Sequence, residues 1–432
     1  MSEVRVGWAK REITPARGYG MSGYIARHGA SVGVLDPLYV RVLLLEQDTT
    51  RAAIVLADVL LISSRWADRL RQKISSCLQI TPECVVVAAT HTHSGPILDM
   101  YPFAFTGECR EPHLGEYSTK LEGTILAGIR AAQRRLKSAI VSFAKIEIDG
   151  VATDRNRRGA SRRQSFFIFR FDGPHQAALF AVFGCHPTVL GADNRKFSGD
   201  LHGEISRILE KNYAIALVAN GAAGNISTRF IRKQQSAAEL KRLAAKAARQ
   251  VSSARFRPLE ISSIKAHTRQ IVLPLSIHKK DELPSRPRLT GRASILFNEG
   301  LQVRKRLSRS AKFSQPTLKT LVTMWRIGSI TIAALPWEIY SDTGKVLWKQ
   351  RRIAPLCYAN GYWGYLPSAA ATEHDYEVLS SPFTRAADRR LRQALVAPSF
   401  SRRDTTEANH RKRSSSVKGV TRESSHFARR SR

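Results

Sequence analysis

Residues 85–96 read VVVAATHTHSGP, a short run of small and β-branched apolar residues that ends on two histidines. Short runs of this composition are typical of buried β-strands. Similar runs recur along the chain, so this strand belongs to a set. We predict buried strands at Leu38–Leu45, Ala52–Ala57, Cys84–Ala89, Ala178–Phe183, Ala214–Ala219 and Ile327–Leu335.

Segments with helical spacing of apolar residues stand beside several of these strands. The predicted helices are Ser64–Leu78, Tyr117–Leu136, Leu201–Lys211 and Ala237–Val251. Strands that alternate with helices indicate layered sheets rather than an all-β fold. The sequence therefore predicts an α/β fold in which layered sheets with flanking helices form a single large domain.

The domain is predicted to span residues 1–398, and two stretches differ from the rest. Residues 279–319 are rich in basic residues and proline and predict an extended basic insertion, although 294–308 has the spacing of a helix. Residues 399–432 are rich in Ser and Arg and have almost no large apolar side chains. Such a segment cannot bury enough surface to offset its ordering entropy, so we expect a disordered basic tail.

Positive charge is the strongest global feature of the composition. Lys and Arg number 69 against 35 Asp and Glu, a formal net charge of +34. A surface of this charge attracts polyanions, and an anionic membrane surface is the partner we consider. The alternative is solvated surface charge without a partner. We do not expect nucleic acid as a partner, because no recognition motif accompanies the charge.

The N-terminal residues and the cysteines bear on location. The first residues, MSEVRVGWAKRE, lack the apolar core of a secretory signal, and no apolar run is long enough to span a membrane. We therefore expect a cytoplasmic protein. The five cysteines are scattered without CxxC spacing, which argues against a disulfide framework and against a cysteine-based zinc site.

The two histidines after the first quoted strand are candidate metal ligands. In an extended backbone, residues two apart point to the same side, so His91 and His93 can face one site. Imidazole is the commonest protein ligand for zinc. The small neighbours Ser94 and Gly95 leave room for a substrate.

Two further strand ends carry metal-binding side chains. His186 follows an apolar run in FGCHPT, and Glu338 follows another in AALPWE. Ligands in open α/β sheets gather beyond the carboxyl ends of strands, so both groups can reach a shared site and complete a His/His/Glu shell. The structural alternatives are a packed histidine and an acid that stabilises a helix N-terminus.

Two turn-like segments carry hydroxyl groups. NGYWGYLP at 360–367 holds two tyrosines three residues apart, and NGAAGNISTR at 220–229 holds Ser227 after a strand. Aromatic residues in such turns commonly pack, and a Gly/Ala-rich turn commonly serves close backbone packing, so a structural role is the alternative for each.

Taken in order, these motifs resemble those of the N-terminal catalytic domain of the neutral/alkaline (non-lysosomal) ceramidase family. The resemblance extends from about Gly7 to Glu377. It opens with AKREITP at 9–15 and GMSGY at 20–24, which are close to the family's A-x-x-D-I-T-x-P and M-x-G-Y. It continues through THTHSGP, HPT and the NGY-x-x-Y turn, and THTHSGP is its most specific element.

The resemblance implies a zinc ion and a role for individual residues. By position, the implied zinc ligands are His91, His186, Glu338 and Tyr365. Four more residues match other active-site positions of the family, and His93 matches the one close to the reacting carbonyl. They are His93, Arg157 of the pair Asn156-Arg157, Tyr376 (one residue short of the family's spacing) and Ser227, the serine of the family's G-D-V-S-P-N hexapeptide. Here that hexapeptide reads GNISTR, without its acid and its proline.

The implied activity is zinc-dependent hydrolysis of the amide bond of an N-acyl lipid, ceramide or ceramide-like. We expect a zinc-activated water to attack, with His93 moving a proton and with Arg157 and Tyr376 stabilising the oxyanion. Attack by Ser227 with histidine assistance is the rival mechanism. The alternative functions are hydrolysis of another small N-acyl amide and a non-catalytic metal- or polyanion-binding homologue.

Overall fold

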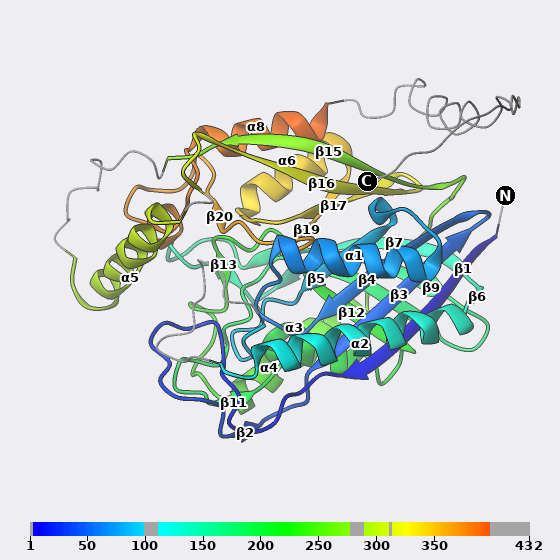
Figure 1. Cartoon of the computed structure of the whole chain (residues 1–432), viewed down its shortest axis with the longest axis horizontal. Helices are drawn as coiled ribbons and strands as arrows, with labels where there is room; N and C mark the ends of the chain where they lie inside the picture. Colours follow the sequence, from blue (N-terminus) through cyan, green and yellow to red (C-terminus); the bar gives the residue numbers. More distant parts are fainter. Residues whose placement is uncertain (1–2, 99–110, 277–288, 311–312, 398–432) are drawn as a thin grey trace, which may run out of the picture. The chain divides into compact units, whose positions relative to one another are not determined.

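Three larger β-sheets form the centre of the fold (Figure 1). The computed structural model describes residues 3–98, 111–276, 289–310 and 313–397. The chain up to Leu395 forms one compact unit. The predicted tail at 399–432 lies outside the described residues, as does the first part of the predicted insertion, 279–288.

The first sheet has the strand order β5-β4-β3-β1-β6. Its strands are β1 (Val4–Glu12), β3 (Tyr39–Gln47), β4 (Thr50–Ala57), β5 (Val85–Ala89) and β6 (Lys137–Ser138). β4 and β5 pair in parallel, and the other pairs are antiparallel. All five residues of β5 are buried, as expected for a strand that is apolar on both faces.

The second and third sheets each combine antiparallel strands with one parallel pair. The second has the order β12-β10-β9-β7-β14, and β10 and β12 are its parallel pair. Its strands are β7 (Ile140–Asp149), β9 (Arg163–Asp172), β10 (Ala177–Phe183), β12 (Ile215–Asn220) and β14 (Arg257–Pro258). The third has the order β15-β16-β17-β19, and β17 and β19 are its parallel pair. Its strands are β15 (Ile264–Pro274), β16 (Thr317–Ile327), β17 (Ile330–Leu335) and β19 (Ile353–Cys357).

One predicted strand is divided in the structure. The run Ile327–Leu335 contains the end of β16, a turn and β17, which are antiparallel neighbours. Gly328 makes the turn possible because its φ of +58° lies in the left-handed region that glycine adopts without strain.

Three two-stranded sheets lie outside these larger sheets, and two of them carry residues of the candidate site. They are β2 (Gly33–Val34) with β11 (Lys196–Phe197), β8 (Thr153–Asp154) with β13 (Ile226–Ser227), and β18 (Glu338–Ile339) with β20 (Tyr365–Leu366).

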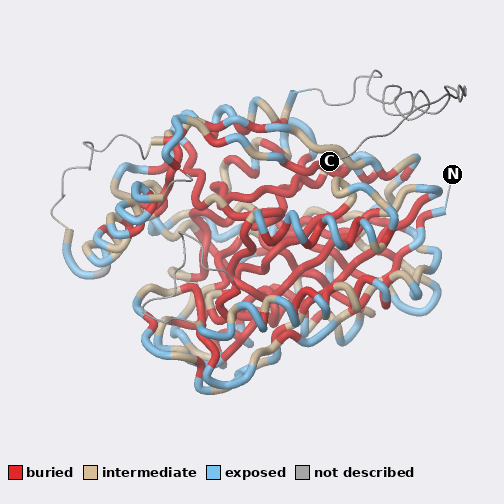
Figure 2. The backbone as a smooth tube through the Cα atoms, in the orientation of Figure 1, coloured by how far each residue is buried: buried red, intermediate tan, exposed pale blue. Residues whose placement is uncertain are grey.

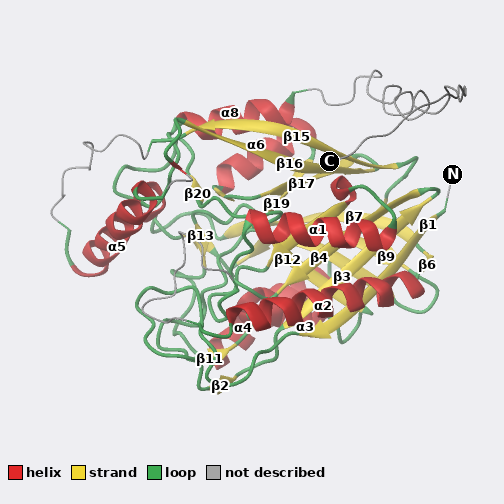
Figure 3. Cartoon of the chain, in the orientation of Figure 1, coloured by secondary structure: helices red, strands yellow, loops and turns green. Residues whose placement is uncertain are grey.

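Helices flank the sheets (Figure 3). They are α1 (Ser64–Leu78), the 3-10 helix η1 (Pro82–Cys84), α2 (Leu114–Arg134), α3 (Asp200–Leu209), α4 (Ala237–Ser252), α5 (Gly291–Ser308), α6 (Ser341–Arg351), α7 (Tyr376–Leu379) and α8 (Ala386–Val396). α2 packs on β1 and β3, α3 on α4 and β12, and α6 on β19. Ser63 and Ser236 cap α1 and α4 by accepting backbone N–H bonds, so their hydroxyls fix where these helices begin.

The three larger sheets share one hydrophobic core. A single cluster contains Leu43 of the first sheet, Phe169 of the second and Ile332 of the third, and Figure 2 shows the buried backbone continuing through the sheets. A second cluster lies beneath α3 and α4 and includes Ile205 and Leu243. The predicted α/β class with layered sheets and flanking helices is confirmed. Among the described residues, no helix combines the length and the apolar character needed to cross a membrane.

Candidate metal centre and active site

The candidate site is built at the carboxyl ends of the parallel strand pairs. His91 follows β5, and His186 follows β10. Glu338 begins β18 just after β17, and Tyr365 begins β20 in the loop beyond β19. The sheets converge there, because isolated bridges join Ala88 to Ala359 and His186 to Ser227. The four candidate metal ligands therefore lie beyond the carboxyl ends of strands, where ligands gather in open α/β sheets.

The four predicted metal ligands lie together and are buried. His186 Nε2 is 2.8 Å from Glu338 Oε2 and 3.2 Å from the Tyr365 hydroxyl. His91 Nε2 is 3.7 Å from Glu338 Oε1. His93 joins the same group, because its Nε2 is 3.3 Å from His91 Nε2. The ring nitrogens of the three histidines all lie within 4.8 Å of one another.

Backbone carbonyls fix the tautomer of each histidine in this group. Every Nδ1 contacts a carbonyl oxygen, which can only accept, so every Nδ1 carries the proton. The contacts are His91 Nδ1 with Leu60 O at 2.8 Å, His93 Nδ1 with Gly23 O at 2.7 Å, and His186 Nδ1 with Ala223 O at 2.7 Å. In a neutral ring the Nε2 atom then presents a lone pair to the centre of the site.

The donor set fits a metal ion. Burial lowers the pKa of His91, His93 and His186 well below the ordinary value, which favours the neutral rings. Two neutral Nε2 lone pairs then face each other between His91 and His93, and a third faces a Glu338 oxygen. These acceptor–acceptor contacts repel unless a cation lies between them. Imidazole nitrogen and carboxylate oxygen are ordinary zinc ligands, and a metal-bound histidine commonly donates its other ring N–H to a backbone carbonyl that orients it.

Two tyrosines position Glu338. The Tyr358 hydroxyl donates to Oε2 at 3.1 Å, and the Tyr362 hydroxyl donates to Oε1. Burial raises the pKa of both phenols well above the ordinary value, so they remain donors. The Tyr358 ring also stacks on His91 with a centroid distance of 3.9 Å. His91 itself has a φ of +66°, which is unusual for a non-glycine residue and typical of functional sites.

An arginine that the sequence analysis did not select lies beside Tyr365. Arg155 Nε donates to Glu377 Oε1 at 2.5 Å, and its Nη2 donates to the Tyr365 hydroxyl at 3.1 Å and to Gly224 O at 2.8 Å. Burial alone would lower the pKa of Arg155, but the Glu377 carboxylate raises it well above the ordinary value. Asn156 Nδ2 donates to the second Glu377 oxygen at 2.9 Å.

The structure does not bring Arg157 to the cavity that Arg155 lines. Arg157 is exposed, and it donates to the carbonyl oxygen of Ala370. The reason is local: Asp154 Oδ1 accepts the Asn156 N–H and Asn225 O accepts the Arg155 N–H, which fixes the turn after β8. Matching the Asn-Arg pair in sequence selected position 157, whereas the geometry places position 155 at the site.

Ser227 and Tyr376 line the same cavity as His91 and His93. The Ser227 hydroxyl accepts the backbone N–H of Arg229 at 3.2 Å. Tyr376 opens α7, and its ring lies 5.9 Å from that of Tyr365, centroid to centroid, in an edge-on arrangement. Burial raises the pKa of Tyr376, so its hydroxyl is a proton donor at neutral pH.

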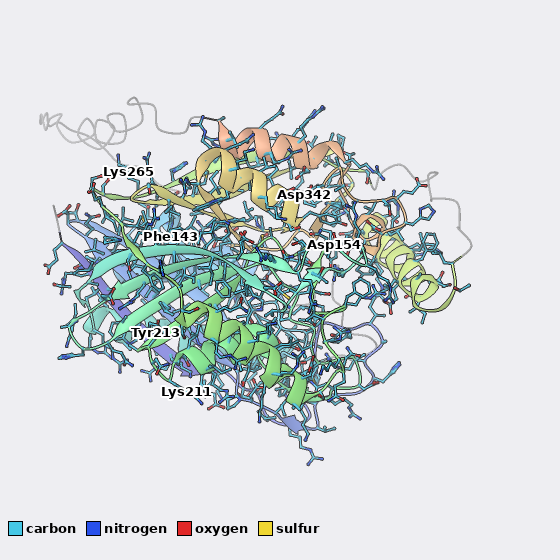
Figure 4. All side chains as sticks on the ribbon, turned by 180° about the vertical axis from the view of Figure 1, so that it is seen from behind. Phe143, Asp154, Lys211, Tyr213, Lys265 and Asp342 are labelled. Atoms are coloured by element: carbon cyan, nitrogen blue, oxygen red, sulfur yellow. The ribbon has the colours of Figure 1, made fainter. Side chains whose placement is uncertain are left out.

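Asn225, which stands in place of the acid of the hexapeptide motif, connects two elements of the fold through its side chain. Its Nδ2 donates to Asp154 Oδ2 at 2.8 Å, and its Oδ1 accepts the Ser341 N–H at 2.9 Å. It therefore joins β8 to the start of α6, the elements marked by the labels Asp154 and Asp342 in Figure 4.

Comparisons with known proteins place this fold and site in context. The sequence profile described as neutral/alkaline non-lysosomal ceramidase, N-terminal, matches residues 4–228. The chain resembles the crystal structure of neutral ceramidase from Pseudomonas aeruginosa, with a TM-score of 0.70 and 18% identity over 92% of this chain and 74% of that one. It also resembles a structure titled ceramidase complexed with C2, with a TM-score of 0.69 and 17% identity over the same shares. No curated protein matches the sequence. The profile covers more than half of the chain, so the chain belongs to the neutral/alkaline non-lysosomal ceramidase family, a family of hydrolases.

Proposed function

We propose that the protein is a zinc-dependent hydrolase that cleaves the amide bond of an N-acyl lipid, ceramide or ceramide-like. One observation carries the proposal: the unprotonated Nε2 atoms of His91 and His186 both face the buried Glu338 carboxylate, each towards a different oxygen. A zinc ion held there by His91, His186, Glu338 and Tyr365 would supply a water of lowered pKa and polarise a substrate carbonyl.

The remaining side chains supply proton transfer and charge stabilisation. His93 is the least buried of the three histidines and faces the cavity, so its Nε2 is placed to take a proton and to return it to the leaving amine. Tyr376 and Arg155 carry O–H and N–H donors on the same cavity, where they would stabilise a developing oxyanion.

The geometry favours a site-lining role for Ser227 over a nucleophilic one. A serine nucleophile needs a base within hydrogen-bonding distance of its hydroxyl. The Ser227 hydroxyl instead accepts the Arg229 N–H, and the link between Ser227 and His186 is a backbone bridge.

The test is metal content and turnover in His91→Ala. We expect the wild-type protein to bind roughly one zinc per chain and the variant to lose both the zinc and the hydrolysis of N-acyl substrates. His175→Ala, in an exposed turn, is the matched control and should change neither. Zinc and turnover retained in His91→Ala would contradict the ligand assignment.

The positive charge of the chain supports a second proposal, that the protein binds anionic membrane surfaces. A formal charge of +34 favours approach to anionic lipid surfaces, where an N-acyl lipid substrate would reside. Sedimentation with vesicles that contain anionic lipid should be strong at low salt and weak at high salt, and equal binding to neutral vesicles would contradict it.

A further inference from the structure

Arg27 is a buried arginine whose hydrogen bonds reach a histidine of the candidate site. Only 3% of the residue is exposed. Its guanidinium donates to Ser22 O at 2.8 Å, to His93 O at 2.8 Å and to Asn194 O at 3.0 Å. Within the described part of the chain, its remaining hydrogen-bond acceptor is Gly191 O at 3.5 Å, so all four are backbone carbonyls. Because a buried charge is costly unless it is hydrogen-bonded, these contacts hold Arg27 and the carbonyls in one arrangement.

The carbonyls that Arg27 binds belong to three segments that border the candidate site. Ser22 begins a turn, and residues 23–26 of that turn line the cavity of the candidate site. His93 lies on the segment that follows β5, and Asn194 lies on the segment between β10 and β11. Arg27 therefore joins the turn to two segments that follow strands of different sheets.

The same turn holds the side chain of His93. The His93 Nδ1 donates to Gly23 O at 2.7 Å, and the Tyr24 ring lies 5.0 Å from the imidazole, centroid to centroid. Gly23 has a φ of +112°, and a Cβ at this position would lie 2.6 Å from His93 Cα, so glycine allows the close approach. The Arg27 guanidinium lies over the Tyr24 ring, with Cζ 4.9 Å from its centroid. The turn thus contacts His93 through its backbone carbonyl, its Nδ1 and its ring.

The other two histidines of the site are held by other parts of the chain. His91 Nδ1 contacts Leu60 O, and His186 Nδ1 contacts Ala223 O. Among the described residues, none of the hydrogen bonds of Arg27 reaches a side chain of the four candidate metal ligands. We therefore expect the loss of Arg27 to disturb His93 and to leave the metal ligands in place.

We propose that Arg27 is a positioning residue for amide hydrolysis: it binds the His93 carbonyl and the turn that accepts the His93 Nδ1 proton, and so holds Nε2 where a proton is transferred. This inference rests on the proposed role of His93. Proton transfer requires hydrogen-bonding distance to the reacting atom, and a misplacement of about 1 Å can cost roughly 100-fold in rate. Lysine is a poor substitute, because its ammonium is a compact point charge, whereas the planar guanidinium fork spans three segments.

The first test is steady-state hydrolysis of N-dodecanoylsphingosine, a ceramide, together with the zinc content of each protein. Arg27→Ala should lower kcat by roughly 10- to 100-fold, keep KM within about 3-fold of wild type and retain its zinc. Arg195→Ala is the matched control, because this exposed guanidinium also donates to a carbonyl of the loop after the turn, Ala30 O, at 3.0 and 3.1 Å. The control should keep kcat within about 3-fold of wild type.

A double-variant cycle with His93→Gln shows whether Arg27 acts through His93. In the His93→Gln background, Arg27→Ala should lower kcat by less than about 3-fold, because the group that it positions is already absent. A residue that only supports the fold would cost the same factor in both backgrounds, and that result would overturn the inference. A wild-type kcat in Arg27→Ala, or a loss of zinc that matches the loss of activity, would also overturn it. Arg27→Lys, which keeps the charge, serves the same cycle if Arg27→Ala does not fold.

A measurement without turnover separates this inference from the proposed function. In protein with isotope-labelled histidine, the Nδ1 proton of His93 should give an NMR signal that exchanges slowly with solvent, because Gly23 O accepts it. The signal is assigned by its absence in His93→Gln. It should be lost in Arg27→Ala and persist in Arg195→Ala, and an unchanged signal in Arg27→Ala would refute the inference even in an active hydrolase. If the wild type cleaves no N-acyl substrate, the proposed function fails, and this signal still decides whether Arg27 positions His93.

Discussion

Replacing Glu377 by glutamine should destabilise the fold far more than an ordinary surface charge change. The Arg155–Glu377 ion pair has an N–O distance of 2.5 Å, and its side chains are 16% and 1% exposed. Removing one partner of a buried pair typically costs 3–5 kcal/mol because the other charge stays buried. Glutamine keeps the size of Glu377 and part of its hydrogen bonding to Asn156, so we expect a loss of about 3 kcal/mol in the free energy of unfolding.

The measurement is urea-induced unfolding followed by fluorescence, with wild type and variant compared in the same metal-free buffer. Glu204→Gln is the matched control, because it removes the carboxylate of an i,i+3 pair whose partner Arg207 is 44% exposed. Glu204 is 4% exposed, but the Arg207 guanidinium keeps its contact with solvent when the carboxylate is removed, so we expect a loss below about 1 kcal/mol. A second variant, Arg155→Met with Glu377→Leu, removes both charges and should recover part of the lost stability.

Equal and small losses in Glu377→Gln and Glu204→Gln would refute the reasoning. They would mean that water reaches Arg155 and that the pair does not organise the cavity. A double variant less stable than Glu377→Gln alone would also count against the argument, since it would locate the cost in lost packing rather than in an unpaired charge.

Other perturbations follow from the same geometry. Tyr362→Phe removes a hydroxyl that donates to Glu338 and should weaken zinc affinity by roughly 10- to 100-fold, measured by competition with a chelator. Gly224→Ala should also weaken zinc binding, because a Cβ would lie 2.9 Å from Glu338 O and 2.8 Å from Tyr340 Cδ1 and would displace β18; unchanged affinity would contradict this. Burial raises the pKa of Asp200 to about 6, so its contribution to stability is complete below about pH 4 and is lost as pH rises through 6. Between pH 4 and 7 the free energy of unfolding of the wild type should therefore fall by up to about 3 kcal/mol relative to that of Asp200→Asn. If the free energies of the two proteins, measured by urea unfolding, change in parallel with pH, the pKa of Asp200 is not raised.

Most strands that the sequence predicted are buried on both faces. β5 and β10 are continuous apolar runs, and burial from both sides makes such runs visible without knowledge of their neighbours. β7 and β15 were not predicted because polar residues interrupt them, and they are buried only in part. Which residues of β7 and β15 are exposed depends on where each strand lies in its sheet, and the whole fold determines that position.

The candidate ligands were predictable for a related reason. A histidine or glutamate directly after an apolar strand stands at a sheet edge, and three such edges meet at His91, His186 and Glu338. The Arg155–Glu377 pair was missed because its partners are 222 residues apart and each resembles an ordinary charged surface residue. Their contact depends on how α7 packs beside β20, which no local pattern records.

The sequence motif alone does not decide whether His93 binds the metal or transfers a proton, and the structure bears on this choice. Five side chains of the candidate site approach one another. A zinc ion in a protein usually has four ligands, and in a catalytic site one of the four is a water molecule. The Nδ1 contacts do not distinguish the histidines, because each one donates to a carbonyl. Exposure does distinguish them: His91 and His186 are 2% and 0% exposed, whereas His93 is only half-buried and borders the cavity. A buried ligand is protected from exchange with solvent, and a proton carrier must reach the substrate. We therefore propose His93, rather than His91 or His186, for proton transfer.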